Sequence, residues 1–277
     1  MRYFTVLSLI CFGFELLVFA QERTKYPQVE VPGGTFLVGC SENDHLCDDD
    51  EGPEGGVAVD VPAFMIDIQE TSVAEYRECV EAGVCTKPFD FRRVHYCSYD
   101  APQRDDYPVN CVDWQQALNY CQWRGGRLAY EVEWEKAARA GTSTPYFWGE
   151  ERSNCKRAVM DPGQPGESDF ETDGCWRDLS WPRNSFPPNP LGLFDVIGGT
   201  SEWVMDWYDP EVHEKYFRRG KLTGPDKGSE KTIKAGSWDE KHWAQRVSNR
   251  FHKPITGNPD LYGSNGIRCV NEIDPQS

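Results

Sequence analysis

Positive charge is scarce in this 277-residue chain: 29 lysines and arginines stand against 45 aspartates and glutamates, a formal net charge of -16 at pH 7. A surface this acidic repels nucleic-acid phosphates and anionic headgroups, so we expect no nucleic-acid partner. The excess of carboxylates suits bound cations instead. After the first twenty residues no segment is apolar enough to cross a bilayer, so we expect no membrane span in the mature chain.

Motifs that hold transition metals are also missing. The sequence has no Cys-x-x-Cys pair, and its five histidines show no His-x-His or His-x-x-x-His spacing. Zinc sites and many other histidine sites carry such spacings. We therefore interpret His242 and His252 as solvent-exposed side chains rather than metal ligands.

The first twenty residues form the one strongly apolar segment. Arg2 precedes the apolar run, and Val18-Phe19-Ala20 offers a cleavage site typical of a secretory signal. We expect a mature chain that is secreted or periplasmic. The predicted organisation is a signal peptide over 1–20, a tail over 21–29, one domain over 30–271 and a tail over 272–277.

Ten cysteines remain after the predicted cleavage, an even number that predicts a disulfide framework in an exported chain. Four pairs lie close in sequence, and Cys121 and Cys269 are left over, but spacing alone leaves the connectivity open. The close pairs are Cys40 with Cys47, Cys79 with Cys85, Cys97 with Cys111, and Cys155 with Cys175.

Capping signals predict three helices. Ser72 with Glu75 forms one capping box, and Asp113 with Gln116 forms another. The expected spans are 73–82, from 114 up to Gly125, and 131–140. Short strands are predicted over 31–39 and 57–67, whereas Gly, Pro, Asp and Asn dominate 141–192. The pattern indicates an α+β domain with long loops.

Several segments then occur in an order that resembles the formylglycine-generating enzyme family, the sulfatase-modifying factors. They are PGGTFLVG, IQETSVAEYREC, YPVNCVDW, GGRLAYEVEWEKAARAG, YFWGE, NPLGLFDVIGGTSEWVMDWYD, AGSW, RVSNR and GIRC. The resemblance implies a loop-rich, C-type-lectin-like α+β fold that is braced by disulfides and calcium. It also implies a disulfide between Cys121 and Cys269.

The family's calcium-binding stretch matches FDVIGGTSEW. The resemblance assigns Asp195 and Glu202 as side-chain ligands, and Gly198 and Thr200 as carbonyl ligands with Ile197 nearby, which is hard-oxygen chemistry that suits Ca²⁺. Gly199 departs from the family, which usually has Asn there. A weaker second calcium site maps to Asp173 and the carbonyl of Cys175, where Asp161 takes the place of an expected Asn.

The family's enzymes oxidise a sulfatase cysteine with two thiols that bind copper, and those thiols are missing here. The matching segment, AGSWDEKHWAQRVSNR (235–250), contains no cysteine. Soft thiolates are the ligands that Cu(I) requires. We therefore expect no formylglycine-generating activity, no copper and no iron, and no catalytic residue is assigned.

Two functions stay open. The first is a non-catalytic module whose loop after GSW binds a protein, peptide or glycan through Asp239, Glu240, His242 and Trp243, helped by the nearby Trp176 and Trp181. Trp238, Arg246 and Arg250 are expected to be structural. The second is a divergent metal-dependent oxidoreductase or an accessory factor in sulfatase maturation. The missing thiol pair favours the first.

Overall fold

Three small sheets organise the fold. The computed structural model describes residues 25–89, 96–163, 165, 175, 179–255 and 262–273. The predicted signal peptide, Asp173 and Trp176 lie outside these ranges. Within them, no helix is long and apolar enough to cross a membrane.

The first sheet has the order β1-β4-β10-β5 and is antiparallel throughout. The second pairs β2 only with β3. The third has the order β8-β7-β6-β9, and its β6–β9 pair is parallel. The strands are β1 (Gln28–Val31), β2 (Gly34–Val38), β3 (Val57–Val61), β4 (Phe64–Asp67), β5 (Arg127–Leu128), β6 (Ser201–Trp207), β7 (Glu230–Lys234), β8 (Phe251–Pro254), β9 (Asn265–Gly266) and β10 (Cys269–Glu272).

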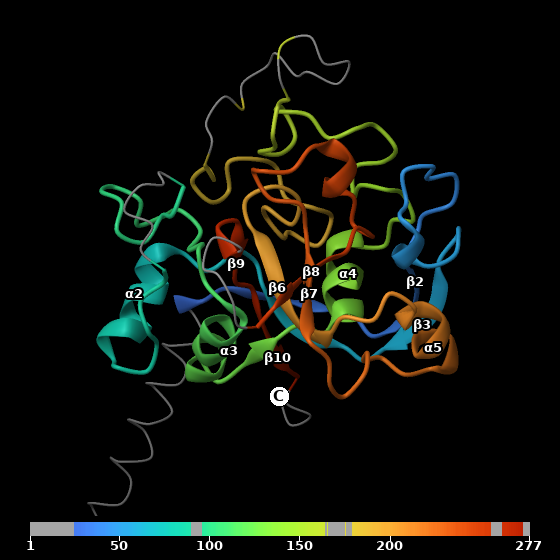
Figure 1. Ribbon diagram of the computed structural model, residues 1–277, viewed down its shortest axis with the longest axis horizontal. Coiled ribbons are helices and arrows are strands. Elements are labelled where there is room, and N and C mark those ends of the chain that lie inside the picture. Colours follow the sequence, from blue (N-terminus) through green and yellow to red (C-terminus); the bar gives the residue numbers. More distant parts are fainter. Residues whose placement is uncertain are drawn as a thin grey trace, which may run out of the picture.

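The three predicted helices are confirmed, and short helical turns add to them. Helices α2 and α3 lie on one side of the central strands β6 and β7, whereas α4 lies on the other side with β2, β3 and α5 (Figure 1). The helices are α2 (Val73–Glu81), α3 (Trp114–Trp123), α4 (Glu131–Arg139) and α5 (Val212–Lys215), with 3-10 turns η1 (Asp49–Glu51), η2 (Phe217–Arg219) and η3 (His242–Gln245).

Both capping boxes form as predicted. The Ser72 hydroxyl accepts a hydrogen bond from the Glu75 backbone N–H, and the Glu75 carboxylate accepts one from the Ser72 N–H. Asp113 and Gln116 exchange the same pair of bonds. Each box satisfies two backbone donors at a helix start that would otherwise lack partners.

The predicted strands are confirmed in part. The segment 57–67 divides into β3 and β4, and β2 lies within 31–39. Strand β1 begins at Gln28, inside the segment expected to be a tail, because it pairs along the whole of β4. Between α4 and β6 the described residues contain no helix or strand, as the composition of that stretch predicts.

The ten cysteines form five disulfides, and every expected pair is confirmed. The long one joins Cys121 in α3 to Cys269 at the start of β10, across a sequence separation of 148. It therefore fastens the C-terminal strand of the first sheet to a helix from the first half of the chain.

Helix α4 carries charged side chains into the interior. Glu131, Glu135 and Arg139 follow each other at intervals of four, so they share one helix face, and all three are buried. Glu131 pairs with Arg250 at 2.5 Å, and Glu135 pairs with Arg139 at 2.9 Å. The Lys234 Nζ lies 3.1 Å from Glu135. The charges are thus compensated in the interior, where an unpaired ion is costly.

His213 lies against this network and was not singled out from the sequence. Its side chain is buried, and its ring packs edge-on against Phe217 and closely against Gly39 and Gly52. Burial lowers the pKa of His213 to about 4, so the imidazole is neutral at neutral pH.

Candidate functional site

The loop that precedes β6 leads directly into Glu202, the second residue of that strand. Glu202 is fully buried. Its carboxylate accepts a hydrogen bond from the Trp134 indole at 2.6 Å and two from the Arg268 Nε at 2.9 and 3.1 Å. Both oxygens of Glu202 are therefore engaged by side chains, and Arg268 compensates its charge.

Glu70, which the sequence analysis did not single out, completes this site. It is buried, and its Oε1 accepts hydrogen bonds from the backbone N–H and the hydroxyl of Thr200. Its Oε2 is buried and has no hydrogen-bond partner among the described residues. An orphaned carboxylate oxygen in a protein interior is uncommon and points to a missing cation or water.

Gly199 lies directly against the Glu70 carboxylate. The residue has φ +66, and a Cβ there would lie 2.6 Å from the Glu70 Oε2. Any side chain at this position would displace the Glu70 carboxylate.

Carboxyl groups outnumber arginines in this site. Glu70, Asp195 and Glu202 act on one another electrostatically, Arg268 acts on all three, and Arg183 also acts on Asp195. Burial, reinforced by Asp195 and Glu202, raises the pKa of Glu70 well above its usual range. Burial likewise raises the pKa of Asp195 to about 6. A cation bound among these carboxyl groups would favour their ionised forms.

Backbone carbonyl oxygens add to the groups that could coordinate a cation here. The residues Ile197 and Gly198 are buried, and their carbonyls accept no hydrogen bond from any described residue. The described residues contain no group of three His, Cys, Asp or Glu side chains that could hold a metal ion. A site here would depend mainly on carbonyl oxygens, and such oxygens, with the free Glu70 oxygen, are of the kind that Ca²⁺ binds.

Only part of the weaker second calcium site falls within the described residues. Cys175 is buried in its disulfide with Cys155, while Asp173 lies outside the described residues. Asp161 accepts a hydrogen bond from the Gly163 N–H within its own turn. That site stays a prediction.

The loop after GSW holds both buried and exposed side chains. Asp239 is exposed, and Trp243 is 43% exposed. His242, expected to be exposed, is buried, because η3 turns it inward and its carbonyl accepts a hydrogen bond from the Tyr146 hydroxyl. Glu240 was also expected to face solvent, but it is half-buried. Its carboxylate accepts hydrogen bonds from the N–H and the hydroxyl of Ser237. His252 is exposed, as expected.

The residues expected to be structural are confirmed in that role. Trp238 is 3% exposed. Arg246 binds Glu51 through both terminal nitrogens and reaches Asp44 at 3.2 Å. Arg250 is held by Glu131. These contacts fix both ends of the segment between Trp238 and Arg250.

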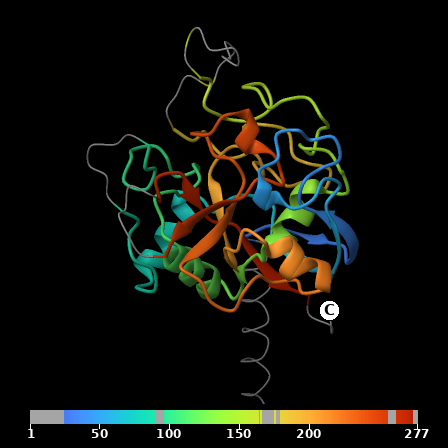
Figure 2. The ribbon, with the colours of Figure 1, turned by 45° about the vertical axis from the view of Figure 1, so that its right-hand side comes forward.

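Arg246 also joins η3 to the acidic loop that the Cys40–Cys47 disulfide closes. The two segments lie side by side in both views (Figures 1 and 2). Leu46 in this loop is 43% exposed. We call the exposed side chains of Asp239, Trp243 and Leu46 the display surface. Trp181, the other aromatic expected nearby, is half-buried and stacks on Phe186.

Comparison with known proteins gives the same family as the motifs. The profile of the sulfatase-modifying factor enzyme 1-like domain matches residues 15–273. The formylglycine-generating enzyme of Mus musculus is 27% identical over 294 aligned positions, which cover 89% of this chain and 75% of the mouse protein. A second Mus musculus protein, inactive C-alpha-formylglycine-generating enzyme 2, is 33% identical over 69% of this chain and 72% of its own length.

Solved structures share the fold. PvdO from Pseudomonas aeruginosa superposes with a TM-score of 0.71 at 26% identity, and the match covers 89% of this chain and 94% of PvdO. Treponema denticola variable protein 1 gives a TM-score of 0.66 at 17% identity, over 90% of this chain and 95% of that protein. The second likeness concerns the fold alone.

Proposed function

The chain belongs to the family of sulfatase-modifying factor enzyme 1-like domains, and from this membership we propose that it is an exported, non-catalytic binding module stabilised by calcium. One observation carries the proposal. The segment that holds the catalytic thiols in the family's enzymes has no cysteine here, yet Arg246 and Arg250 hold its ends in place and Trp243 remains exposed.

The thiol chemistry has no substitute among the other cysteines. All ten cysteines after the predicted signal are paired in disulfides, so none of them offers a thiolate. Relatives of the chain include proteins from mouse and cattle whose names describe them as inactive. The paired cysteines and these relatives support the proposal that the chain keeps the fold without the oxidase activity.

The display surface is the proposed contact for a protein, peptide or glycan ligand. A half-exposed tryptophan on a rigid segment offers a large contact area at a small entropic cost, and tryptophan is enriched at binding hot spots. Five disulfides are typical of proteins in oxidising compartments, which agrees with export through the predicted signal peptide.

Substitution of Trp243 separates binding from folding. Trp243→Ala changes the free energy of unfolding by at most about 0.5 kcal/mol, because the side chain is exposed. The matched substitution at buried Trp238, Trp238→Ala, costs about 3–5 kcal/mol. Urea unfolding measures the free energy of unfolding of both variants. A glycan array and pull-downs from culture supernatant then compare the ligands bound by the wild type with those bound by Trp243→Ala. If Trp243→Ala binds every ligand as tightly as the wild type does, the display surface is not the binding site.

We propose that calcium binds at the carbonyls of Ile197, Gly198 and Thr200 and at the free oxygen of Glu70, near Asp195. Glu202 would become a ligand only after its carboxylate releases Arg268. Calcium supplies charge compensation and rigidity in this position, and no chemical step depends on it. The orphaned Glu70 oxygen and the unpartnered carbonyls of Ile197 and Gly198 support the proposal.

Elemental analysis of the secreted protein tests this assignment. We expect one or two equivalents of calcium and no copper or iron, and we expect a chelator to lower the melting temperature. Calcium at about a hundred times its Kd stabilises the fold by about 2.7 kcal/mol. Glu70→Gln should lower the calcium content, whereas Glu54→Gln, at an exposed position before β3, should not. Identical melting with calcium and with chelator would rule the site out.

A further inference from the structure

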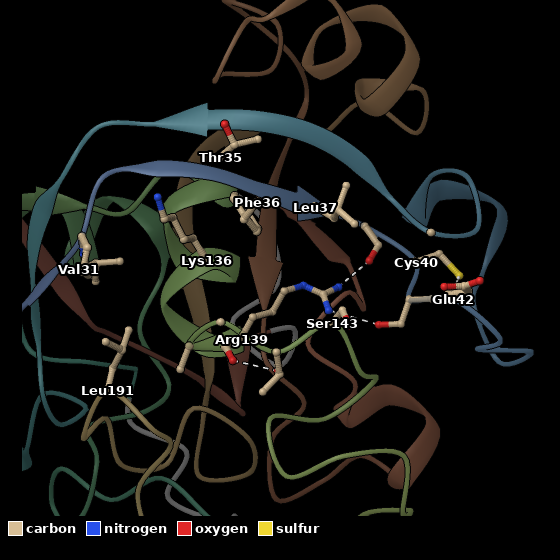
Figure 3. Close-up of a pocket in the computed structure, with 17 residues that line it drawn as sticks. Val31, Thr35, Phe36, Leu37, Cys40, Glu42, Lys136, Arg139, Ser143 and Leu191 are labelled. Atoms are coloured by element: carbon tan, nitrogen blue, oxygen red, sulfur yellow. Dashed lines mark hydrogen bonds between the residues drawn. The ribbon is translucent and has the colours of Figure 1, made fainter.

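A cavity of about 540 Å³ lies beside strand β2, and none of the three residues of the display surface lines it. The strand contributes one wall, and the end of α4 with the segments after it contributes the other (Figure 3). The residues that matter here are Thr35, Phe36 and Leu37 on β2, and Arg139, Ser143 and Leu191 on the facing wall. Neither calcium nor the loop after GSW is involved in this cavity.

The cavity runs along the edge of β2 rather than over one of its faces. Thr35 and Leu37 are exposed, whereas Phe36 is half-buried and Val38 is buried, as expected for side chains that alternate between two faces. Three consecutive residues from both faces nevertheless line the same cavity. In Figure 3 the facing wall lies on one side of β2 and β3 lies on the other. This edge of β2 has no strand neighbour among the described residues.

The backbone just after β2 is hydrogen-bonded to the facing wall of the cavity. One residue after the strand, the Gly39 N–H donates to Glu135 at 2.7 Å and the Gly39 carbonyl accepts from Arg139 at 2.5 Å. Backbone groups alternate between the two edges along a strand, and we expect those of Thr35 and Leu37 to lie on the edge away from β3. The N–H and carbonyl groups of Thr35 and Leu37 donate or accept no hydrogen bond outside the β2–β3 pair among the described residues.

The two ends of the cavity carry opposite charges. Lys136 lines it near the start of β2 and Glu42 lines it beyond the end of the strand (Figure 3). Lys136 donates to the carbonyls of Gly34 and Val61, and no described carboxylate lies within ion-pair distance of it. An added antiparallel strand would place its C-terminal end near Lys136 and its N-terminal end near Glu42.

We propose that the edge of β2 is a docking site for an extended peptide segment of another protein. The segment adds to β2 as an antiparallel third strand, pairs with the backbone of Thr35 and Leu37, and packs an apolar side chain against Phe36 and Leu191. A basic residue at its start faces Glu42 and an acidic residue at its end faces Lys136. Addition of a strand to an exposed edge is a recurring mode of peptide recognition.

A flexible segment fits this cavity better than a second folded copy of the chain. The segment 140–143 and Leu191 flank the β2 edge. An edge strand that is embedded in a folded domain brings its own neighbours with it, and these would collide with that wall. A chain with a net charge of -16 also repels a second copy of itself.

The test uses the mature protein and a labelled peptide, Lys-Val-Thr-Val-Thr-Val-Asp, in fluorescence anisotropy. Two further peptides carry N-methyl groups on alternate residues. In the first peptide the methyl groups lie along one edge of the extended chain, and in the second they lie along the other edge. A docked strand uses only one of its edges, so one methylated peptide binds like the parent and the other binds at least about tenfold more weakly, as expected from the loss of two or more hydrogen bonds. Equal binding of both methylated peptides, or no binding of the parent at about 1 mM, would overturn the proposal.

Variants at Leu37 separate the backbone from the side chain. Leu37→Pro removes an N–H that does not face β3, and Pro is tolerated at such edge positions. It should weaken binding of the parent peptide at least about tenfold, whereas Leu37→Ala should weaken it at most about threefold. Melting temperatures confirm that both variants fold. Equal weakening by the two variants would indicate an apolar contact instead of strand pairing, and if Leu37→Pro does not fold, the methylated peptides decide.

Discussion

Replacement of both Cys121 and Cys269 by Ala lowers the free energy of unfolding by about 5 kcal/mol. The disulfide closes a loop with a sequence separation of 148, and a cross-link over so long a loop removes a large part of the conformational entropy of the unfolded chain. Both cysteines are fully buried, so the lost packing adds to the effect. Urea unfolding under non-reducing conditions measures the change.

The matched control is the short disulfide between Cys79 and Cys85, which closes a separation of 6. The same chain-entropy relation gives about 2 kcal/mol for Cys79→Ala with Cys85→Ala. Both double variants remove one buried disulfide, so their difference isolates the loop length. Equal losses would show that this long cross-link stabilises only through local packing.

Arg268→Met should cost about 3–5 kcal/mol. Its guanidinium donates to Glu202 and also to the carbonyls of Asp67 and Phe194 at 3.0 and 2.8 Å, so Met would leave a buried carboxylate without its cation. Arg218→Met removes only an exposed ion pair with Glu214 and should cost about 0.5 kcal/mol or less.

Urea unfolding of both arginine variants, first in chelator and then with calcium, gives two readouts. A cost at Arg268 no larger than that at Arg218 would contradict its role as the compensating cation. If calcium occupies the same site, it should restore part of the stability of Arg268→Met, since the vacated position lies among Glu70, Asp195 and Glu202.

Local features of the fold were predictable from the sequence. The capping boxes at Ser72 and Asp113 depend on residues three positions apart, and both are present as expected. The close cysteine pairs are similarly local. The Cys121–Cys269 pair was implied by family resemblance, and the structure confirms it.

Features that depend on distant contacts were missed. Glu70 contacts Thr200, which is 130 residues away, so no local pattern marks it as part of the candidate site. The burial of His242 depends on how η3 packs on Tyr146, almost a hundred residues earlier. Strand β1 has too short a pattern to stand out, and it forms because β4 offers it a pairing edge. The cavity along β2 likewise exists only once α4 has packed beside that strand.

The long disulfide also determines how the protein responds to a protease. Cutting any single peptide bond between Cys121 and Cys269 leaves two fragments that stay covalently joined, because the cross-link closes the ring that contains the cut. That ring includes the long stretch between α4 and β6, where irregular loops offer proteases their usual sites. A clipped molecule therefore gains only the mass of one water until it is reduced, so a reducing gel separates the intact and clipped forms whereas their masses before reduction are almost equal.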